Sequence, residues 1–208
     1  MRKISILMVW LSLNCFNIIH ASSLEDQAII KKIEHYLNGI QFLVSNFIQN
    51  NPDQTQFQGT LYLTRKAFHK NKGKMAIIYQ GGVKQKLIAK DGELTIYDLK
   101  DGTKSSYDMT STPFAFILEP KIDLHTNITV ERMCKEGAFL EVTLSPKADA
   151  TGQSMTLCFN LYPNGNLKYL ERWVIKDIQG NYTSVNLILS TMRINDSKVV
   201  PENIFFHP

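Results

Sequence analysis

Residues 86–109, KLIAKDGELTIYDLKDGTKSSYDM, decide the fold class. Apolar and polar side chains alternate within KLIAK, ELTIYDL and KSSYDM, a pattern typical of strands with one buried face. The dipeptides Asp91-Gly92 and Asp101-Gly102 separate these segments, and Asp-Gly pairs favour the tight turns of β-hairpins. The stretch therefore predicts a three-stranded antiparallel meander.

Similar segments continue on both sides of this meander. Breaks rich in Gly, Asn, Asp and Pro separate them, with turns at 135–137, 164–165 and 179–181. The pattern predicts about eleven strands in sequence-adjacent hairpins, which favours one large antiparallel sheet. The other expected strands cover 41–49, 57–65, 74–80, 127–134, 138–144, 154–162, 167–177 and 182–189, followed by IFFHP at 204–208.

Two segments predict helix. Residues 24–40 have apolar side chains at helical spacing, and Gly39 is a plausible C-terminal stop. The helix is amphipathic, so its apolar face needs a partner. PFAFILEP, residues 113–120, predicts a shorter helix that Thr112-Pro113 opens and Pro120 closes.

Strand alternation defines an inner, mostly apolar face of the sheet. A sheet of this size must curl, and two short helices cannot cover its apolar face completely. An open apolar concavity of this kind accommodates apolar ligands, although any single residue on it could instead belong to an ordinary core. The inner face contains Leu61, Leu63, Arg65, Met75, Ile77, Tyr79, Leu87, Ala89, Leu94, Ile96, Leu140, Val142, Leu144, Met155, Leu157, Phe159, Leu161, Val185, Leu187 and Leu189.

The N-terminus predicts an exported protein. A short basic stretch, MRK, precedes the apolar run 4–19, and small residues follow, so residues 1–21 resemble a cleaved signal peptide. Cleavage is expected after Ala21 or Ser23, leaving one domain over 22–208. Cys15 is preceded by Asn14 and followed by more apolar residues, which argues against lipid attachment at this cysteine.

Composition and motifs argue against several function classes. The 208 residues are 44% hydrophobic and 20% charged, and the net charge of +4 includes Arg2 and Lys3 of the signal peptide. This mild charge gives no support for nucleic-acid binding. No nucleophile elbow, P-loop, HExxH or Cys-x-x-Cys motif occurs, so we expect no enzyme, no metal and no cofactor.

Two cysteines remain in the mature chain, Cys134 and Cys158. The expected strands place them on either side of a third strand, roughly 9–10 Å apart, which is beyond disulfide reach. We therefore expect two free thiols.

Six blocks of the sequence together resemble a known family. YLNGIQFLVSNFIQ, GTLYLTR, GKMAIIY, KLIAKDGELTIYD, STPFAFIL and VIKDIQGNYTSVNL are similar, in order and spacing, to LolA-type outer-membrane lipoprotein carriers, especially their alphaproteobacterial branch. The resemblance runs through about residues 32–207. It implies an unclosed antiparallel β half-barrel with a helical lid over an apolar cavity.

The resemblance also implies a role and partners. Members are periplasmic chaperones, expected here as monomers, that take acylated lipoproteins from an inner-membrane ABC transporter to an outer-membrane acceptor. The expected cavity residues are Leu61, Leu63, Arg65, Met75, Ile77, Tyr79, Leu87, Leu94, Ile96, Phe114, Phe116, Ile117, Leu157 and Phe159.

The family's motifs assign roles to a few residues. Arg65 matches the arginine that holds the lid closed, and Met75 or Phe68 matches the residue that engages the transporter. Where the family has a single proline after that arginine, this chain has seven residues, Lys66–Lys72. This basic turn is either simply solvated or a docking element for an anionic membrane surface or an acidic partner.

Three alternatives stay open from the sequence. A lipid carrier or an envelope-stress lipoprotein sensor would use the same half-barrel, and a secreted enzyme could place its site at the cavity mouth.

Overall fold

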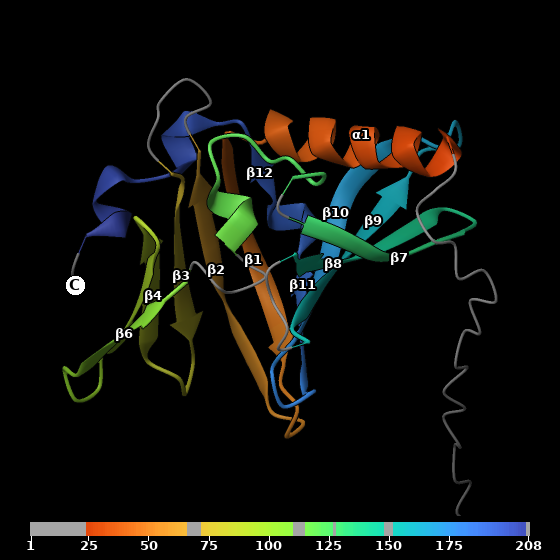
Figure 1. Ribbon diagram of the computed structural model, residues 1–208. Helices are drawn as coiled ribbons and strands as arrows, with labels where there is room; N and C mark the ends of the chain where they lie inside the picture. The colour runs from red at the N-terminus through yellow and green to blue at the C-terminus, as the bar shows by residue number, and fades with distance from the viewer. Residues whose placement is uncertain (1–23, 66–71, 110–114, 127, 148–151, 207–208) are drawn as a thin grey trace, which may run out of the picture.

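In the computed structural model, residues 24–65, 72–109, 115–126, 128–147 and 152–206 are described. They form one antiparallel sheet of twelve strands, with α1 (Leu24–Gly39) across one end (Figure 1). The strands are β1 (Phe42–Asn50), β2 (Gln56–Thr64), β3 (Lys74–Gln80), β4 (Gln85–Lys90), β5 (Glu93–Asp98), β6 (Lys104–Asp108), β7 (Ile128–Glu136), β8 (Phe139–Pro146), β9 (Ser154–Leu161), β10 (Leu167–Lys176), β11 (Tyr182–Leu187) and β12 (Arg193–Ile194).

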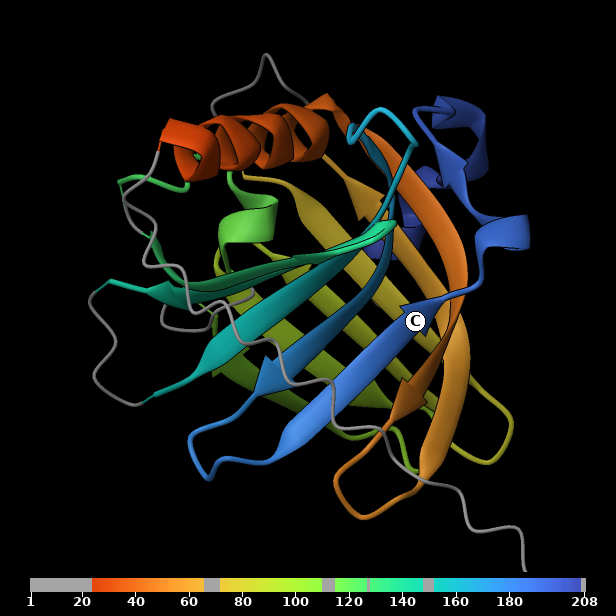
Figure 2. The ribbon, with the colours of Figure 1, turned by 90° about the vertical axis from the view of Figure 1, so that its right-hand side faces the viewer.

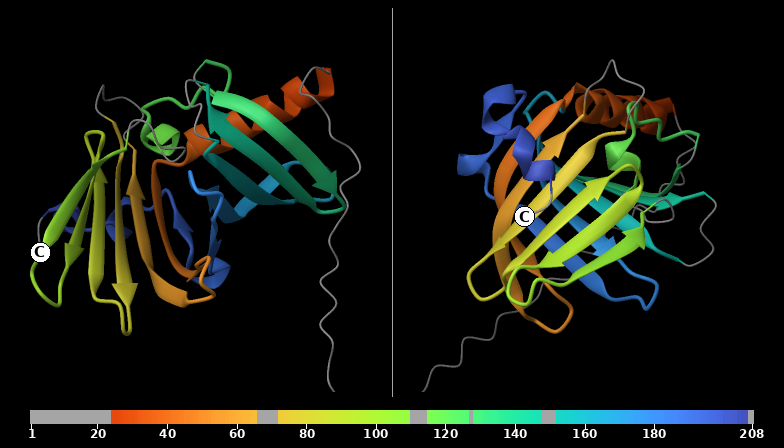
Figure 3. Two further views of the ribbon diagram at one scale, coloured as in Figure 1. Left: turned by 60° about the horizontal axis from the view of Figure 1, so that its bottom comes forward. Right: turned by 90° about the vertical axis from the view of Figure 1, so that its left-hand side faces the viewer.

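The sheet curls without closing. Its order is β6-β5-β4-β3-β2-β1-β11-β10-β9-β8-β7, with β12 paired to β1. The strands β6 and β7 form the two ends of this order, and Figures 2 and 3 show the two halves of the sheet facing each other across the interior. The predicted fold class, an unclosed β half-barrel with a helical lid, is therefore confirmed.

The turn between β4 and β5 follows the predicted chemistry. Asp91 and Gly92 have φ angles of 55° and 86°, so both central residues of the β4–β5 turn are in the left-handed region. Such a turn matches the right-handed twist of the flanking strands, and Asp and Gly tolerate its backbone. The β4–β5 register, from Gln85–Asp98 to Lys90–Glu93, is fixed accordingly.

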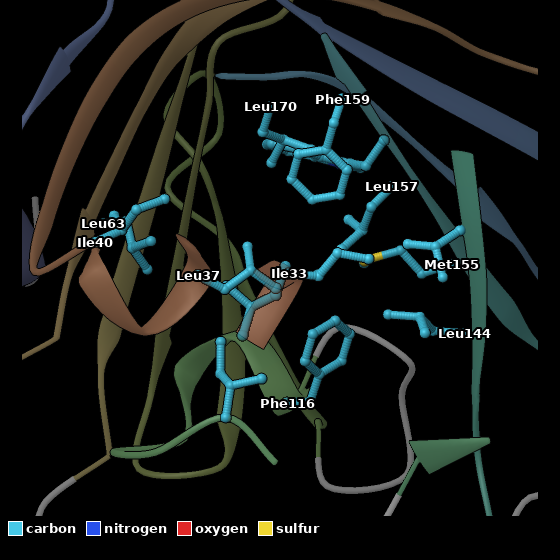
Figure 4. Packing of buried hydrophobic residues seen from close by; sticks show 14 of the residues in the cluster. Ile33, Leu37, Ile40, Leu63, Phe116, Leu144, Met155, Leu157, Phe159 and Leu170 are labelled. Atoms are coloured by element: carbon cyan, nitrogen blue, oxygen red, sulfur yellow. The ribbon is translucent and has the colours of Figure 1, made fainter. Parts of the chain in front are cut away.

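The apolar face of α1 packs on one half of the sheet. Ile33 and Leu37 are buried, and Figure 4 shows them beside Phe116 and the β9 side chains Leu157 and Phe159. Phe116 belongs to a 3-10 helix, η1 (Ala115–Leu118), which lies below α1 (Figures 1 and 2). Together α1 and η1 are called the lid.

A second apolar cluster covers the outer face of the sheet. It contains Ala76 of β3 with Val200 and Phe205 from the C-terminal segment, where the 3-10 helices η3 (Ser197–Val199) and η4 (Glu202–Phe205) lie. The buried amine of Lys86 donates a hydrogen bond to the Phe206 carbonyl at 2.8 Å. The C-terminal segment therefore covers apolar side chains on the outer face of β1, β2 and β3.

Several expected elements differ from the structure. IFFHP was expected as a strand, but Ile204 and Phe205 belong to η4, because their side chains cover the apolar outer face of the sheet. Strand β11 ends at Leu187, and Leu189 belongs to a 3-10 helix, η2 (Leu189–Thr191), rather than to the inner face. Among the described residues of the segment 113–120, the expected helix is limited to the short η1, and β12 was not predicted.

The cysteines follow the expectation in part. Cys158 is free and buried, which confirms that part of the expectation. The register pairs Glu141 with both Cys134 and Cys158, so the two cysteines do flank β8. Cys134 is disulfide-bonded, however, so the expectation of a free thiol is wrong for this residue.

Candidate functional site

Arg65 connects the end of β2 to both parts of the lid. Its guanidinium donates hydrogen bonds to the carbonyl of Ile40 from Nε (3.2 Å) and Nη2 (3.0 Å), and to the carbonyl of Leu37 from Nη2. Nη1 donates to the carbonyl of Ile117 in η1 at 3.4 Å. The terminal carbonyls of an α-helix have no intrahelical partner and carry partial negative charge, so this position suits a cation.

The Arg65 side chain is only 4% exposed. Burial lowers the pKa of Arg65 to about 10, because the charged form loses its hydration. The guanidinium therefore stays protonated at neutral pH, and each of its three nitrogens donates to one or more of these carbonyls. The sequence assigned Arg65 to the inner face and, by resemblance, to holding the lid; its contacts are those that such a role requires.

Gly73 lies between Arg65 and η1. Its N–H donates to the Leu118 carbonyl at 2.5 Å. A Cβ at this position would lie 2.7 Å from Cγ of Arg65, 2.9 Å from the Thr64 oxygen and 3.2 Å from the Leu118 oxygen. Only glycine fits this approach without displacing a neighbour.

Two further groups of contacts fasten the lid. Lys72 forms an exposed ion pair with Glu119 at 2.9 Å, immediately beside Gly73 and Leu118. On α1, the side-chain amide of Asn38 exchanges two hydrogen bonds with the backbone of Ile122, at 2.8 and 2.9 Å. The chain from η1 to Ile122 is thus attached to both α1 and the start of β3.

An apolar cavity of about 310 Å³ lies inside the half-barrel. This volume is at the lower end of the range of about 300–1,000 Å³ typical of small-molecule sites. Its described walls combine apolar side chains with a few uncharged polar ones. They are Phe47, Gln49, Leu61, Met75, Ile77, Tyr79, Leu87, Leu94, Met109, Gln153, Trp173, Ile175, Thr183 and Val185.

A second, smaller cavity of about 30 Å³ lies against the lid. It shares Leu61, Met75 and Trp173 with the first cavity, and Arg65 is part of its wall. Movement of the lid away from Arg65 would therefore enlarge the space directly adjoining the main cavity.

Twelve of the fourteen predicted cavity residues divide into three groups. Leu61, Met75, Ile77, Tyr79, Leu87 and Leu94 line the main cavity. Leu63, Arg65 and Ile117 line the smaller one beneath the lid. Phe116, Leu157 and Phe159 were expected in the cavity but lie in the packed core, where Phe116 of η1 and the two β9 side chains pack with the apolar face of α1 (Figure 4).

The remaining predicted site residues lie elsewhere or have a further assigned role. Ile96 is half-buried and lines neither of these two cavities. Met75, a candidate for docking the transporter, is 5% exposed and forms cavity wall, so it does not belong to the exposed outer surface of this structure. Phe68 and Phe114 lie outside the described residues, as does most of the basic turn, of which only Lys72 is described.

Sequence reasoning missed several cavity residues. Trp173 points inward together with Leu170, which simple alternation does not allow; an irregularity of register between Leu170 and Arg172 explains this. Phe47 packs over Gly59, where a Cβ would lie 2.8 Å from its ring. The glycine within GTLYLTR was an available signal, since glycine in a strand often marks close approach.

Some kinds of site are not found among the described residues. No group of three or more His, Cys, Asp or Glu side chains there is arranged to hold a metal ion. Within the same ranges, no helix combines the length and apolar character needed to cross a membrane.

Comparisons with solved structures show the same fold at low sequence identity. A DUF1329 family protein from Desulfovibrio piger is 9% identical, with a TM-score of 0.52 over 87% of this chain and 95% of the other. A protein domain from Vibrio parahaemolyticus, described as outer membrane lipoprotein-sorting, is 13% identical, with a TM-score of 0.51 over 86% and 95%. A search among curated protein sequences finds no match.

The sequence itself carries the family assignment. The family model described as outer membrane lipoprotein carrier protein LolA matches residues 38–199, which is most of the chain and includes Arg65, Gly73 and all fourteen cavity residues. With this match, a half-barrel fold and a lid held over an apolar cavity, the chain belongs to the LolA family of outer membrane lipoprotein carrier proteins.

Proposed function

We propose that this protein is a periplasmic chaperone that carries lipoproteins by enclosing their acyl chains in the cavity of the half-barrel. The observation that carries the proposal is the buried Arg65, whose hydrogen bonds hold a lid beside an apolar cavity. The proposed role involves binding and release without chemical change of the cargo, so the protein acts as a carrier rather than an enzyme.

Physical chemistry supports a carrier with a movable lid. Each buried methylene contributes about 0.8 kcal/mol, so a multiply acylated anchor leaves a membrane only if another apolar site replaces that burial. The carrier must also release its cargo, which favours a closed empty state that competes with binding. Hydrogen bonds from one guanidinium to the lid carbonyls supply such a closed state.

The proposed partners follow from the family. Export by a cleaved N-terminal signal peptide would place the chain in the periplasm. An inner-membrane ABC transporter would load it, and an outer-membrane acceptor would receive the cargo. The V. parahaemolyticus domain of the same fold, described as lipoprotein-sorting, is in keeping with this class of role.

Purification of the native chain from cells, followed by mass spectrometry of whatever is bound, tests the proposal. Triacylated lipoproteins in the complex would support it. Free phospholipid without lipoprotein would favour a lipid carrier, and a bound sensor-pathway protein without acyl chains would favour an envelope-stress sensor. Either of these last two results would refute the carrier role.

The matched control is Arg65→Lys. Lysine keeps the positive charge, but its ammonium group lacks the planar fork of N–H donors with which arginine reaches several carbonyls. We expect this variant to carry the same class of cargo with altered release, since Arg65 is proposed to hold the lid and not to choose the ligand.

A further inference from the structure

The wall of the main cavity has a polar end. Four of its fourteen lining residues are polar: Gln49, Tyr79, Gln153 and Thr183. They come from the end of β1, the end of β3, the residue before β9 and the start of β11. Because neighbouring strands are antiparallel, these four positions lie at the same end of the half-barrel, remote from α1 (Figure 1). They are called the polar end.

The register places these side chains close together. Gln49 is paired with Val185, and Thr183 lies two residues further along the same face of β11. Such diagonal neighbours are about 7–8 Å apart between backbone positions, within reach of a long side chain. The Tyr79 hydroxyl donates to Oε1 of Gln49 at 2.8 Å, which connects β3 to β1 across the inner face.

The polar end retains hydrogen-bonding capacity. Nε2 of Gln49 donates one N–H to Oδ1 of Asn51 at 2.7 Å, and a primary amide has a second N–H. The Tyr79 oxygen, having donated its proton, can still accept a hydrogen bond. The Thr183 hydroxyl can donate and accept. This set matches ester, amide and hydroxyl groups, which need both donors and acceptors.

The same wall lacks charge. None of the described residues that line this cavity is Lys, Arg, Asp or Glu. Arg65 borders the smaller cavity next to the lid, and its donors are directed at backbone carbonyls. Transfer of an ionised group into an apolar site without a partner is costly, so this cavity disfavours amphiphiles with charged heads.

We propose that the polar end is a head-group subsite for neutral ester, amide or hydroxyl heads, with the acyl chain extending toward Trp173 and Leu61. The inference rests on the proposed function only in requiring that the cavity takes acyl chains. It adds an orientation of the acyl chain within the cavity and a selectivity for the charge of the head group. A fully acylated lipoprotein end, whose polar groups are esters and an amide, fits this subsite better than a lipid with an ionised head.

Three probes with the same twelve-carbon chain test the proposal: 1-monolauroylglycerol, laurate and dodecylamine. Each is titrated below its micellar concentration at pH 7, against the mature chain loaded with a neutral polarity-sensitive dye such as N-phenylnaphthylamine. We expect the neutral glyceride to displace the dye with an affinity at least about tenfold higher than either ion.

Two variants locate the effect. Gln49→Leu and Thr183→Val remove polar groups from the polar end, and each should weaken glyceride binding by about 2- to 10-fold relative to dye binding measured on the same variant. Ser184→Ala is the matched control, because Ser184 is the next residue of β11 on the opposite face, where its hydroxyl accepts from Asn50 at 3.2 Å. It should leave all three affinities unchanged.

The outcomes separate this inference from the proposed function. Equal affinity for the three probes would overturn the subsite but leave an acyl-chain carrier intact. Tightest binding of laurate would also overturn it, and would indicate a carboxylate beside Arg65 instead. Failure of both dye and probes to bind would refute the carrier and the subsite together. A glyceride preference that the two polar-end variants abolish would support the subsite.

Discussion

Gly73→Ala is the sharpest test of how the lid is held. The new methyl group would lie 2.7 Å from Cγ of Arg65 and 2.9–3.2 Å from two backbone oxygens. Such contacts cannot be kept, and two of the three atoms belong to backbone. The backbone at residue 73, the side chain of Arg65 or both must therefore shift. Both make hydrogen bonds to the closed lid, since the Gly73 N–H donates to Leu118 and Arg65 donates to Ile117.

The size of the effect follows from ordinary overpacking. An inserted methylene in a well-packed site costs typically 1–3 kcal/mol. If that strain is relieved when the lid opens, the opening equilibrium constant rises by about 5- to 150-fold. Lid amides that exchange by this opening then exchange faster by the same factor.

Hydrogen exchange measured by mass spectrometry checks this expectation. The peptide that covers residues 115–124 should show the acceleration, while peptides from β5, far along the sheet from the lid, should exchange as in the parent chain. Gly82→Ala is the matched control, because a Cβ there would meet nothing within 4 Å. Unchanged exchange of the lid peptide in Gly73→Ala, or equal acceleration in Gly82→Ala, would refute the reasoning.

Three further predictions concern the same contacts. Arg65→Leu should slow cargo release, because the closed empty state loses its hydrogen bonds; normal release kinetics from loaded protein would contradict the assigned role. Glu119→Gln should loosen the lid by no more than about 1 kcal/mol, and 1 M salt should have the same small effect on the parent, since the ion pair with Lys72 is exposed. Lid exchange rates, corrected for intrinsic chemistry, should change less than about twofold between pH 6 and 9. The reason is that the pKa of Arg65, lowered to about 10 by burial, lies below its unfolded value. Deprotonation of Arg65 therefore changes the stability of the closed lid only above about pH 10, where that stability rises with pH. A clear transition in the lid exchange rates near pH 7 would argue against Arg65 as the group that holds the lid.

Periodicity predicted the sheet well because its signals are local. The turn at Asp91-Gly92 requires positive φ at both residues, and the sequence supplies side chains that tolerate it. The inward position of Arg65 followed from the same alternation as Leu61 and Leu63. These features depend on neighbouring residues and need no knowledge of the rest of the fold.

The division between core and cavity could not be predicted in this way. By strand alternation Leu157, Phe159 and Ile77 all point inward. The helix α1 covers Leu157 and Phe159, whereas Ile77 lines the cavity. Which inward residues a helix covers depends on where it lies over the sheet, and that is fixed by distant contacts such as the hydrogen bond from the Leu170 N–H to the Tyr36 hydroxyl. Alternation has no information on that placement.

The C-terminal segment was misassigned for a related reason. IFFHP has the apolar content of a strand, but the outer face of β1 to β3 was already apolar and required a cover. Short 3-10 turns satisfy this requirement, because covering the face requires only that apolar side chains pack on it. The backbone of the segment does not have to pair with a strand.

Photo-crosslinking in living cells tests most directly whether the cavity of the half-barrel holds lipoprotein acyl chains. A benzophenone amino acid replaces either Ile77, which lines the cavity, or its neighbour Ile78, which lies on the opposite face of β3. We expect lipoprotein adducts from position 77, carrying their acyl chains, and few or none from position 78. Equal yields from both positions, or adducts from 77 that contain no lipoprotein, would contradict the proposed carrier role.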